Sequence, residues 1–204
     1  MGMKVKEKSR LSSEERRELL KILTYEKVNG KPIYYRDYRK VLKGELPPEA
    51  VMGSSELQAV IIAIILKYLF KALPEDYILL TNELGFIYTP KSFRSLDIAI
   101  YKKKDLLKPQ EKYTKRPPIV VIEIDTKADL SRYKNFEEYM YEKIKDLLDS
   151  GIEKVIWYIT KVKKVLIARR QKDWINKDWD SDVEVLEGVK LNLEKLLKEE
   201  GIEI

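Results

Sequence analysis

The clearest hydrophobic pattern in the chain lies in Pro117–Lys127, which reads PPIVVIEIDTK. Four β-branched residues, Ile119–Ile122, follow a pair of prolines, and such a run is typical of a strand buried on both faces. The run ends in Glu123, Asp125 and Lys127, which a period of two places on one side of the strand. We therefore expect a central strand whose end brings charged side chains to the edge of the core.

Helical periodicity recurs in several places. Ser12 with Glu15 forms a capping box, which predicts a surface helix over 13–23. Apolar positions at helical spacing predict a long helix from Ser54 or Ser55 to Lys71, packed on the sheet. The other expected elements are a hairpin over 24–35, a helix over 37–42, strands over 77–80, 84–88, 96–101, 155–160, 165–170 and 183–189, and helices over 135–150 and 193–199.

The strand expected over 96–101 reads LDIAIY. Its alternation places Asp97 on one face and Leu96, Ile98 and Ile100 on the other. This strand is therefore expected to carry a carboxylate close to that of the central strand.

The length and the mixture of elements predict a single α/β (α+β) domain over 25–204, preceded by an N-terminal extension over 1–24 that carries the first helix. The 40 basic and 34 acidic residues give a net charge of +6, which is compatible with a polyanionic partner such as nucleic acid. The abundance of Lys, Glu and Ile with no Cys is also typical of thermophile proteins.

The basic connection over 102–116, KKKDLLKPQEKYTKR, has two interpretations. It either follows a phosphate backbone, with Tyr101 and Tyr113 stacking on bases, or is an ordinary solvated loop. The sequence leaves both open.

The chain contains no histidine and no cysteine. Thiolate and imidazole zinc sites, disulfides and Ser-His-Asp triads are therefore excluded. Any chemistry must use carboxylates, Lys, Tyr, Ser or Thr, with hard cations such as Mg²⁺ as partners. The longest apolar run, Ala59–Leu66, is too short to span a bilayer, and we see no signal peptide, so a cytoplasmic location without membrane contact is expected.

Two carboxylates on neighbouring strands and one lysine suit phosphodiester hydrolysis. Asp97 and Glu123 would hold a divalent cation, the cation lowers the pKa of a bound water, and Lys143 stabilises charge on the phosphate. The alternative is a pair of strand-end carboxylates neutralised by Arg94, Lys127 or Lys143.

At these residues the sequence resembles the Uma2 (DUF820) family, which comprises restriction-endonuclease-like proteins of the PD-(D/E)XK superfamily. The resemblance covers roughly residues 25–197 and depends on an ordered set of motifs. Leu96 stands where the family usually has the proline of its PD motif. The matching segments are Glu83-Leu84-Gly85, Arg94–Ala99, Val121–Thr126, Lys143 eight residues before Gly151-Ile152, Val155–Ile159 and the ending GVKLNLEKLL.

The resemblance implies a restriction-endonuclease-like fold, with a mixed central β-sheet flanked by helices, and a divalent-metal nuclease site. Asp97 and Glu123 would be metal ligands, and the carbonyl of Ile124 would add a further oxygen. Lys143 would be the superfamily lysine, moved to the following helix, and Glu83 an auxiliary acid.

Two residues stay open. Asp125 is either a third ligand or a solvated acid at the end of the strand. Lys127 is the alternative to Lys143 as the catalytic ammonium.

The function expected from the sequence is therefore a Mg²⁺-dependent or Mn²⁺-dependent DNA endonuclease. The alternative is a non-catalytic nucleic-acid-binding or interaction protein that keeps the nuclease fold. A covalent phosphotransferase that uses Tyr or Ser ranks last, because no activating base is evident. Cleavage of both strands of a duplex would suit a homodimer, for which Trp174, Trp179 and the hairpin aromatics are candidate contacts.

Overall fold

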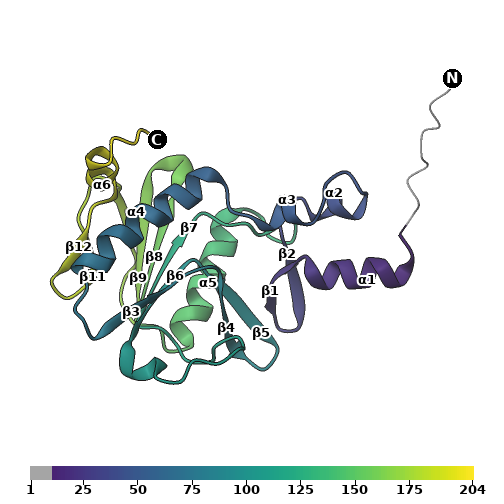
Figure 1. The fold of residues 1–204 in the computed structure, drawn as a ribbon, viewed down its shortest axis with the longest axis horizontal. Helices are drawn as coiled ribbons and strands as arrows, with labels where there is room; N and C mark the ends of the chain where they lie inside the picture. Colours follow the sequence, from purple (N-terminus) through teal and green to yellow (C-terminus); the bar gives the residue numbers. More distant parts are fainter. Residues whose placement is uncertain (1–10) are drawn as a thin grey trace.

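The largest element of the fold is a mixed six-stranded sheet that crosses the middle of the molecule (Figure 1). The computed structural model describes residues 11–204. In the order β10-β9-β8-β7-β6-β3, only β7 and β8 run parallel, and the other neighbours are antiparallel. Its strands are β3 (Tyr77–Leu80), β6 (Ile98–Lys102), β7 (Val120–Ile124), β8 (Lys154–Ile159), β9 (Lys164–Arg169) and β10 (Ile175–Asp178).

A second, four-stranded antiparallel sheet has the order β2-β1-β5-β4, and a two-stranded hairpin follows near the C-terminus. Asn29 and Gly30 form the tight turn between β1 and β2, both with positive φ, as the Asn-Gly pair predicted. The strands are β1 (Thr24–Val28), β2 (Lys31–Tyr34), β4 (Leu84–Thr89), β5 (Ser92–Leu96), β11 (Val183–Leu186) and β12 (Val189–Leu191).

Helices cover both faces of the six-stranded sheet, as Figure 1 shows. Helix α5 is the crossover between the parallel strands β7 and β8, which a parallel pair requires. The helices are α1 (Ser13–Ile22), α2 (Tyr38–Leu42), α3 (Glu49–Met52), α4 (Glu56–Ala72), α5 (Phe136–Asp149) and α6 (Leu193–Glu199), with 3₁₀ turns η1 (Lys103–Leu106) and η2 (Thr160–Val162).

Two hydrophobic layers divide the core. One lies between α5, the four-stranded sheet and one face of the large sheet, and includes Val121, Tyr139 and Trp157. The other lies between the opposite face, α4, α6 and the β11-β12 hairpin, and includes Ile61 and Ile122. Because Val121 and Ile122 enter different layers, β7 is buried on both faces, as its uninterrupted apolar run predicted.

The architecture confirms the α+β class and the mixed sheet flanked by helices. The capping box of α1 is present, with Ser12 and Glu15 exchanging hydrogen bonds. The long helix and the crossover helix also form within one or two residues of the predicted bounds. In residues 11–204 no helix is both long and apolar enough to cross a bilayer.

Two of the predicted strands differ from the structure at the candidate site. The expected strand over 96–101 breaks at Asp97, because β5 ends at Leu96 in the small sheet and β6 begins at Ile98 in the large one. Leu96 consequently packs in the same layer as Ala99, so its predicted face was wrong. In the central strand, Asp125 has φ of 50°, which ends the alternation that placed it beside Glu123.

Smaller corrections concern the C-terminal half. The segment over 183–189 is not one strand, because Gly188 (φ 76°) turns the chain between β11 and β12. Trp179 is only 2% exposed and packs against Tyr158, so it does not offer the contact surface for a homodimer that the sequence suggested. The hairpin residue Tyr25 is likewise buried. The basic segment over 1–10 of the predicted extension lies outside the described residues.

Candidate functional site

Asp97 and Glu123 meet where β5 passes into β6 beside the end of β7. The break at Asp97 frees its carboxylate from the ladder, and Oδ2 accepts a hydrogen bond from the backbone N–H of Ile124 at 2.8 Å. Glu123 precedes Ile124 in β7, and the residue is 1% exposed. The strand end therefore brings both predicted carboxylates to one buried place.

Lys143 reaches this place from α5. Its ammonium donates to Oε2 of Glu123 at 2.8 Å and to the carbonyl of Ser95 at 2.6 Å. It also lies 3.0 Å from Oε1 of Glu26, which belongs to β1. An ammonium has three N–H donors, so these three acceptors use all of them. Lys143 thus ties the crossover helix to both sheets.

Glu26 is a buried site residue that the sequence analysis did not identify. Its Oε1 accepts from the N–H of Ser95 at 3.1 Å, and its Oε2 accepts from Arg94 at 2.8 Å and from the hydroxyl of Tyr139 at 2.9 Å. Glu26 lies in a short hairpin strand of mixed composition, and nothing in that pattern distinguishes it from an exposed acid.

Arg94 is completely buried and connects this cluster to the surface of α5. It pairs with Glu26 and with two acids of α5, Glu142 and Asp146, which lie one helical turn apart. Arg94 is therefore engaged by these three carboxylates, and it does not pair with Asp97 or Glu123 as the alternative interpretation allowed.

Carboxylates outnumber cations in the buried part of the cluster. Glu26, Asp97 and Glu123 are all within 5% of complete burial, whereas the buried cations are Arg94 and Lys143. Burial alone would raise the pKa of Glu26, but Lys143 and Arg94 beside it bring that pKa below its ordinary value. Glu26 thus takes the largest share of the neutralising charge.

The other two acids are left with less compensation. Burial raises the pKa of Glu123 to about 8, and Lys143 lowers it only in part. Burial likewise raises the pKa of Asp97, against the effects of Lys143 and of the hydrogen bond from Ile124. Lys143 itself has a raised pKa, because Glu123 and Glu26 outweigh the effect of its burial, so it stays an ammonium.

These residues have the chemistry of a divalent-cation site. Oε1 of Glu123 is buried and, within residues 11–204, receives no hydrogen bond. A buried carboxylate oxygen without a partner next to a second poorly neutralised acid is where an added cation would be stabilised. In the described part of the chain, no three Asp or Glu side chains lie close enough together to hold one metal ion. A cation at this site would therefore have two carboxylate ligands, Asp97 and Glu123. Mg²⁺ is commonly held by one or two carboxylates with water in its remaining positions.

Gln58 of α4 also touches the site and was not predicted. Its Nε2 donates to the carbonyl of Ile124 at 2.9 Å and lies 3.3 and 3.4 Å from the two oxygens of Asp97. The carbonyl of Ile124, a predicted ligand, is therefore hydrogen-bonded in this structure. A polar residue on a nearly apolar helix was the available signal for Gln58.

Glu83 and Lys127 form a separate pair. The ammonium of Lys127 contacts Oε1 of Glu83, whose Oε2 accepts from the hydroxyl of Tyr35 at 3.1 Å. Neither residue contacts Glu123, so the structure brings Lys143 to the acid pair and places Lys127 with the predicted auxiliary acid. Both catalytic assignments stay predictions.

Asp125 makes local hydrogen bonds beside the site, and the ligand role considered for it stays a prediction. Its carboxylate accepts hydrogen bonds from the backbone N–H of Thr160 at 2.9 Å and from the Thr160 hydroxyl at 2.5 Å. The residue is half-buried and fixes the start of η2 against the end of β7. It is thus a structural link beside the site.

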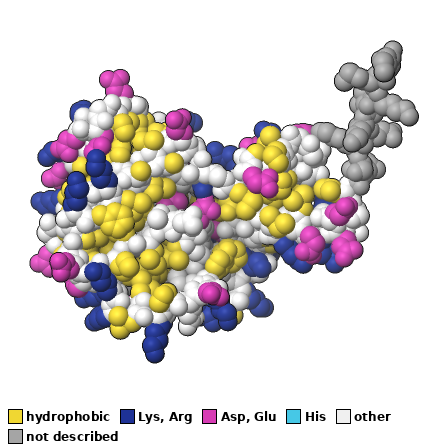
Figure 2. Space-filling view, in the orientation of Figure 1, with side chains coloured by type: hydrophobic (Ala, Val, Ile, Leu, Met, Phe, Trp, Pro, Cys, Tyr) yellow, Lys and Arg dark blue, Asp and Glu magenta, His cyan; other side chains and the backbone are white. Residues whose placement is uncertain are grey.

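A cleft of about 810 Å³ lies directly outside the acid pair. It opens between the segment that carries α2 and α3 and the rest of the molecule, where the surface in Figure 2 narrows. Its lining includes Gln58, Arg36, Lys127 and Lys161, whereas no residue of the basic connection over 102–116 lines it. The acids lie beneath this lining and do not form part of it.

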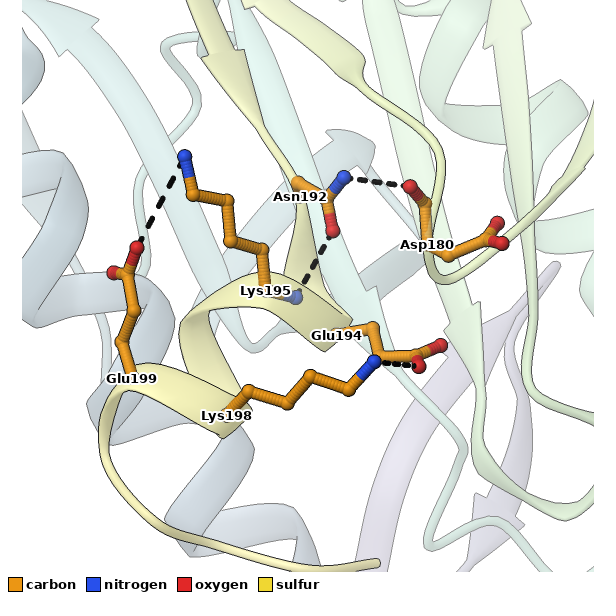
Figure 3. Close-up of a pocket in the computed structure, with 6 residues that line it drawn as sticks. All are labelled: Asp180, Asn192, Glu194, Lys195, Lys198 and Glu199. Carbon is orange, nitrogen blue, oxygen red and sulfur yellow. Dashed lines mark hydrogen bonds and ion pairs between the residues drawn. The ribbon is translucent and has the colours of Figure 1, made fainter.

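A second depression, near the C-terminus, is shown in Figure 3. It is lined by charged residues of α6 that pair along the helix, such as Lys198 with Glu194 at 2.6 Å. None of its lining residues belongs to the acid pair or its neighbours. The cleft over Gln58 is therefore the candidate site.

Comparison with known proteins supports the fold. No protein-family model matches the sequence, and no curated protein matches it. Among solved structures, the chain is similar to a candidate nuclease belonging to DUF820 from Anabaena variabilis ATCC 29413, with a TM-score of 0.57 and 16% sequence identity. The match covers 85% of this chain and 89% of the other. The two proteins share a fold, in agreement with the resemblance found in the sequence.

Proposed function

We propose that the protein is a divalent-metal-dependent nuclease that hydrolyses phosphodiester bonds of DNA at the Asp97 and Glu123 pair. The observation that carries this proposal is the unpartnered, buried Oε1 of Glu123 beside Asp97, in a cluster where carboxylates outnumber cations. The fold shared with a candidate nuclease of DUF820 agrees with it.

Asp97, Glu123 and the carbonyl of Ile124 would hold Mg²⁺ or Mn²⁺. When bound, such an ion lowers the pKa of a water molecule and neutralises charge on the phosphate. Lys143 occupies Oε2 of Glu123 and so leaves Oε1 as the free oxygen. Glu26 holds Lys143 in place, so that a buried ammonium would be available to stabilise charge on a phosphate at the acid pair.

The substrate would approach through the cleft. Lys161 is exposed in the cleft wall, and Arg36 donates to the carbonyl of Thr126 at 2.8 Å, next to the site. Cationic side chains at a cleft attract a phosphate backbone without reading its sequence. A nucleic-acid strand seated there would place a phosphate above Gln58.

One observation favours the non-catalytic alternative. The acid pair is almost fully buried, and the Gln58 amide covers the oxygens of Asp97. A protein that keeps the nuclease fold only to bind nucleic acid would show the same closed site.

The test is cleavage of a labelled DNA duplex and of a single strand with Mg²⁺ or Mn²⁺, compared with EDTA. Asp97→Asn and Glu123→Gln keep the shape of the side chains and remove the charges. We expect cleavage by the native chain, no cleavage in EDTA, and a loss of at least about a hundredfold in each variant. Salt-dependent DNA binding without cleavage would support the alternative instead. Cleavage by both variants at the rate of the native chain would place the chemistry elsewhere.

A further inference from the structure

Three oxygen atoms converge on one nitrogen at the floor of the cleft. Nε2 of Gln58 lies 2.9 Å from the carbonyl oxygen of Ile124 and 3.3 and 3.4 Å from the two carboxylate oxygens of Asp97. A primary amide has two hydrogens, so it cannot make three good hydrogen bonds. The longer two distances are those of weak bonds. The nitrogen thus lies where three oxygens with negative or partly negative charge come together.

Gln58 is fixed in position by the helix that carries it. Its N–H donates to Oγ of Ser55, which caps α4, and the residue is 5% exposed. The Ser55 bond fixes the backbone at Gln58, and burial keeps its side chain against Asp97 and Ile124. All three oxygens that it contacts belong to Asp97 and Ile124, which the proposed function assigns to a cation.

An amide has a second orientation of the same shape. Rotation of its last side-chain torsion by half a turn exchanges Nε2 and Oε1, which replaces a donor by an acceptor. Nitrogen with its two hydrogens repels a cation, whereas amide oxygen is a ligand that Mg²⁺ and Mn²⁺ accept. Entry of a cation therefore favours the turned amide.

We propose that Gln58 is a metal ligand of this site, through Oε1, and that in the cation-free protein its Nε2 takes the place of the cation. This inference rests on the proposed function. Asp97 and Glu123 supply two negative charges for a divalent ion, and a neutral amide adds an oxygen without adding charge. Gln58 also lines the cleft, whereas neither acid does, so the amide lies between the acids and the solvent.

Binding of Mn²⁺ to the metal-free chain of 204 residues tests this assignment, with isothermal titration calorimetry as the readout. Gln58→Met keeps the length of the side chain and removes the amide, and we expect Mn²⁺ binding to weaken by about tenfold or more. Gln58→Glu offers carboxylate oxygens at the same position, and we expect tighter binding than in the native chain. Gln110→Met makes the same chemical change at an exposed position in the basic connection and should leave the dissociation constant unchanged.

The outcomes separate the two proposals. If the native chain does not bind Mn²⁺, both proposals are wrong: the metal site at Asp97 and Glu123, and the ligand role of Gln58. If the native chain binds Mn²⁺ but Gln58→Met binds equally or more tightly, the amide is only an obstruction, and the ligand role alone is overturned. Circular dichroism checks the fold of each variant. Poor folding could weaken Mn²⁺ binding in Gln58→Met, but it could not also produce the tighter binding that we expect in Gln58→Glu.

Discussion

The ammonium of Lys143 lies 2.8 Å from Oε2 of Glu123, although the two residues are 20 positions apart and lie on different elements. The contact exists because β7 and β8 are parallel neighbours, so the connecting helix α5 must cross the face of the sheet that carries Glu123. The same helix brings Lys143 to Glu26 and to the carbonyl of Ser95. One crossover thus joins the acid pair to both sheets.

The two candidate lysines are distinguished by substitution with methionine. Lys143→Met leaves Glu123 and Glu26 without their shared cation, and we expect loss of cleavage together with a fall of about 3–5 kcal/mol in the free energy of unfolding. Lys127→Met removes the contact to Glu83 and should reduce cleavage far less. Cleavage assays and urea unfolding measure both effects. The reverse order of activities would assign the catalytic role to Lys127.

The free energy of unfolding of the metal-free protein should vary with pH because of Glu123. Burial raises the pKa of Glu123 to about 8, from the 4.5 of an exposed glutamate. Between pH 4.5 and 8, Glu123 is therefore protonated in the folded protein and ionised in the unfolded chain. The contribution of this group is therefore complete below about pH 4.5 and is lost as pH rises toward 8, by at most about 1.4 kcal/mol per pH unit.

Urea unfolding in EDTA at several values between pH 5 and 8.5 measures this dependence. Glu123→Gln has no proton to lose, so the difference in stability between the variant and the native chain should grow in favour of the variant as pH rises. A difference that stays constant over this range would show that Glu123 is ionised throughout.

The cleft, rather than the basic connection, should bind the phosphate backbone. Lys161 lines the cleft and Lys104 lies in the connection, and both are exposed. Lys161→Ala should weaken DNA binding and reduce the slope of the logarithm of affinity against the logarithm of salt concentration by about one, and Lys104→Ala should change neither. Fluorescence anisotropy over a series of salt concentrations in EDTA is the measurement. If both variants weakened DNA binding equally, the basic connection would also belong to the DNA-binding surface.

The connection is anchored to the small sheet at Gly85. A Cβ atom at this position would lie 2.5 Å from the ring of Tyr113, whose neighbour Thr114 donates to the carbonyl of Gly85. Gly85→Ala should therefore destabilise the protein by about 1–3 kcal/mol, because the ring must move. In a Tyr113→Ala background the same change should cost much less, which a double-mutant cycle by urea unfolding measures. Equal costs in both backgrounds would contradict the contact.

Local sequence determined most of the elements and part of the candidate site. The apolar run of Ile119–Ile122 predicted a strand buried on both faces, and the structure buries it between two hydrophobic layers. Asn29-Gly30 and the Ser12 capping box act through their immediate neighbours, so their predictions were also confirmed. The resemblance to a known family favoured Lys143 over Lys127 as the catalytic lysine, a choice that no local pattern makes.

The tertiary structure decided which charges meet. The sequence left Arg94, Lys127 and Lys143 as possible partners of the acid pair, and only the path of α5 brings Lys143 there. Glu26 approaches from a hairpin whose pattern marks no site, and Gln58 is marked only as a polar residue on a nearly apolar helix, so their contacts could not be predicted. Alternation of side chains is a local rule that the chain follows until its backbone turns, as at Asp97 and Asp125. Hydrophobic periodicity thus determined the layers, whereas the long-range contacts that neutralise buried charge depend on how those layers pack.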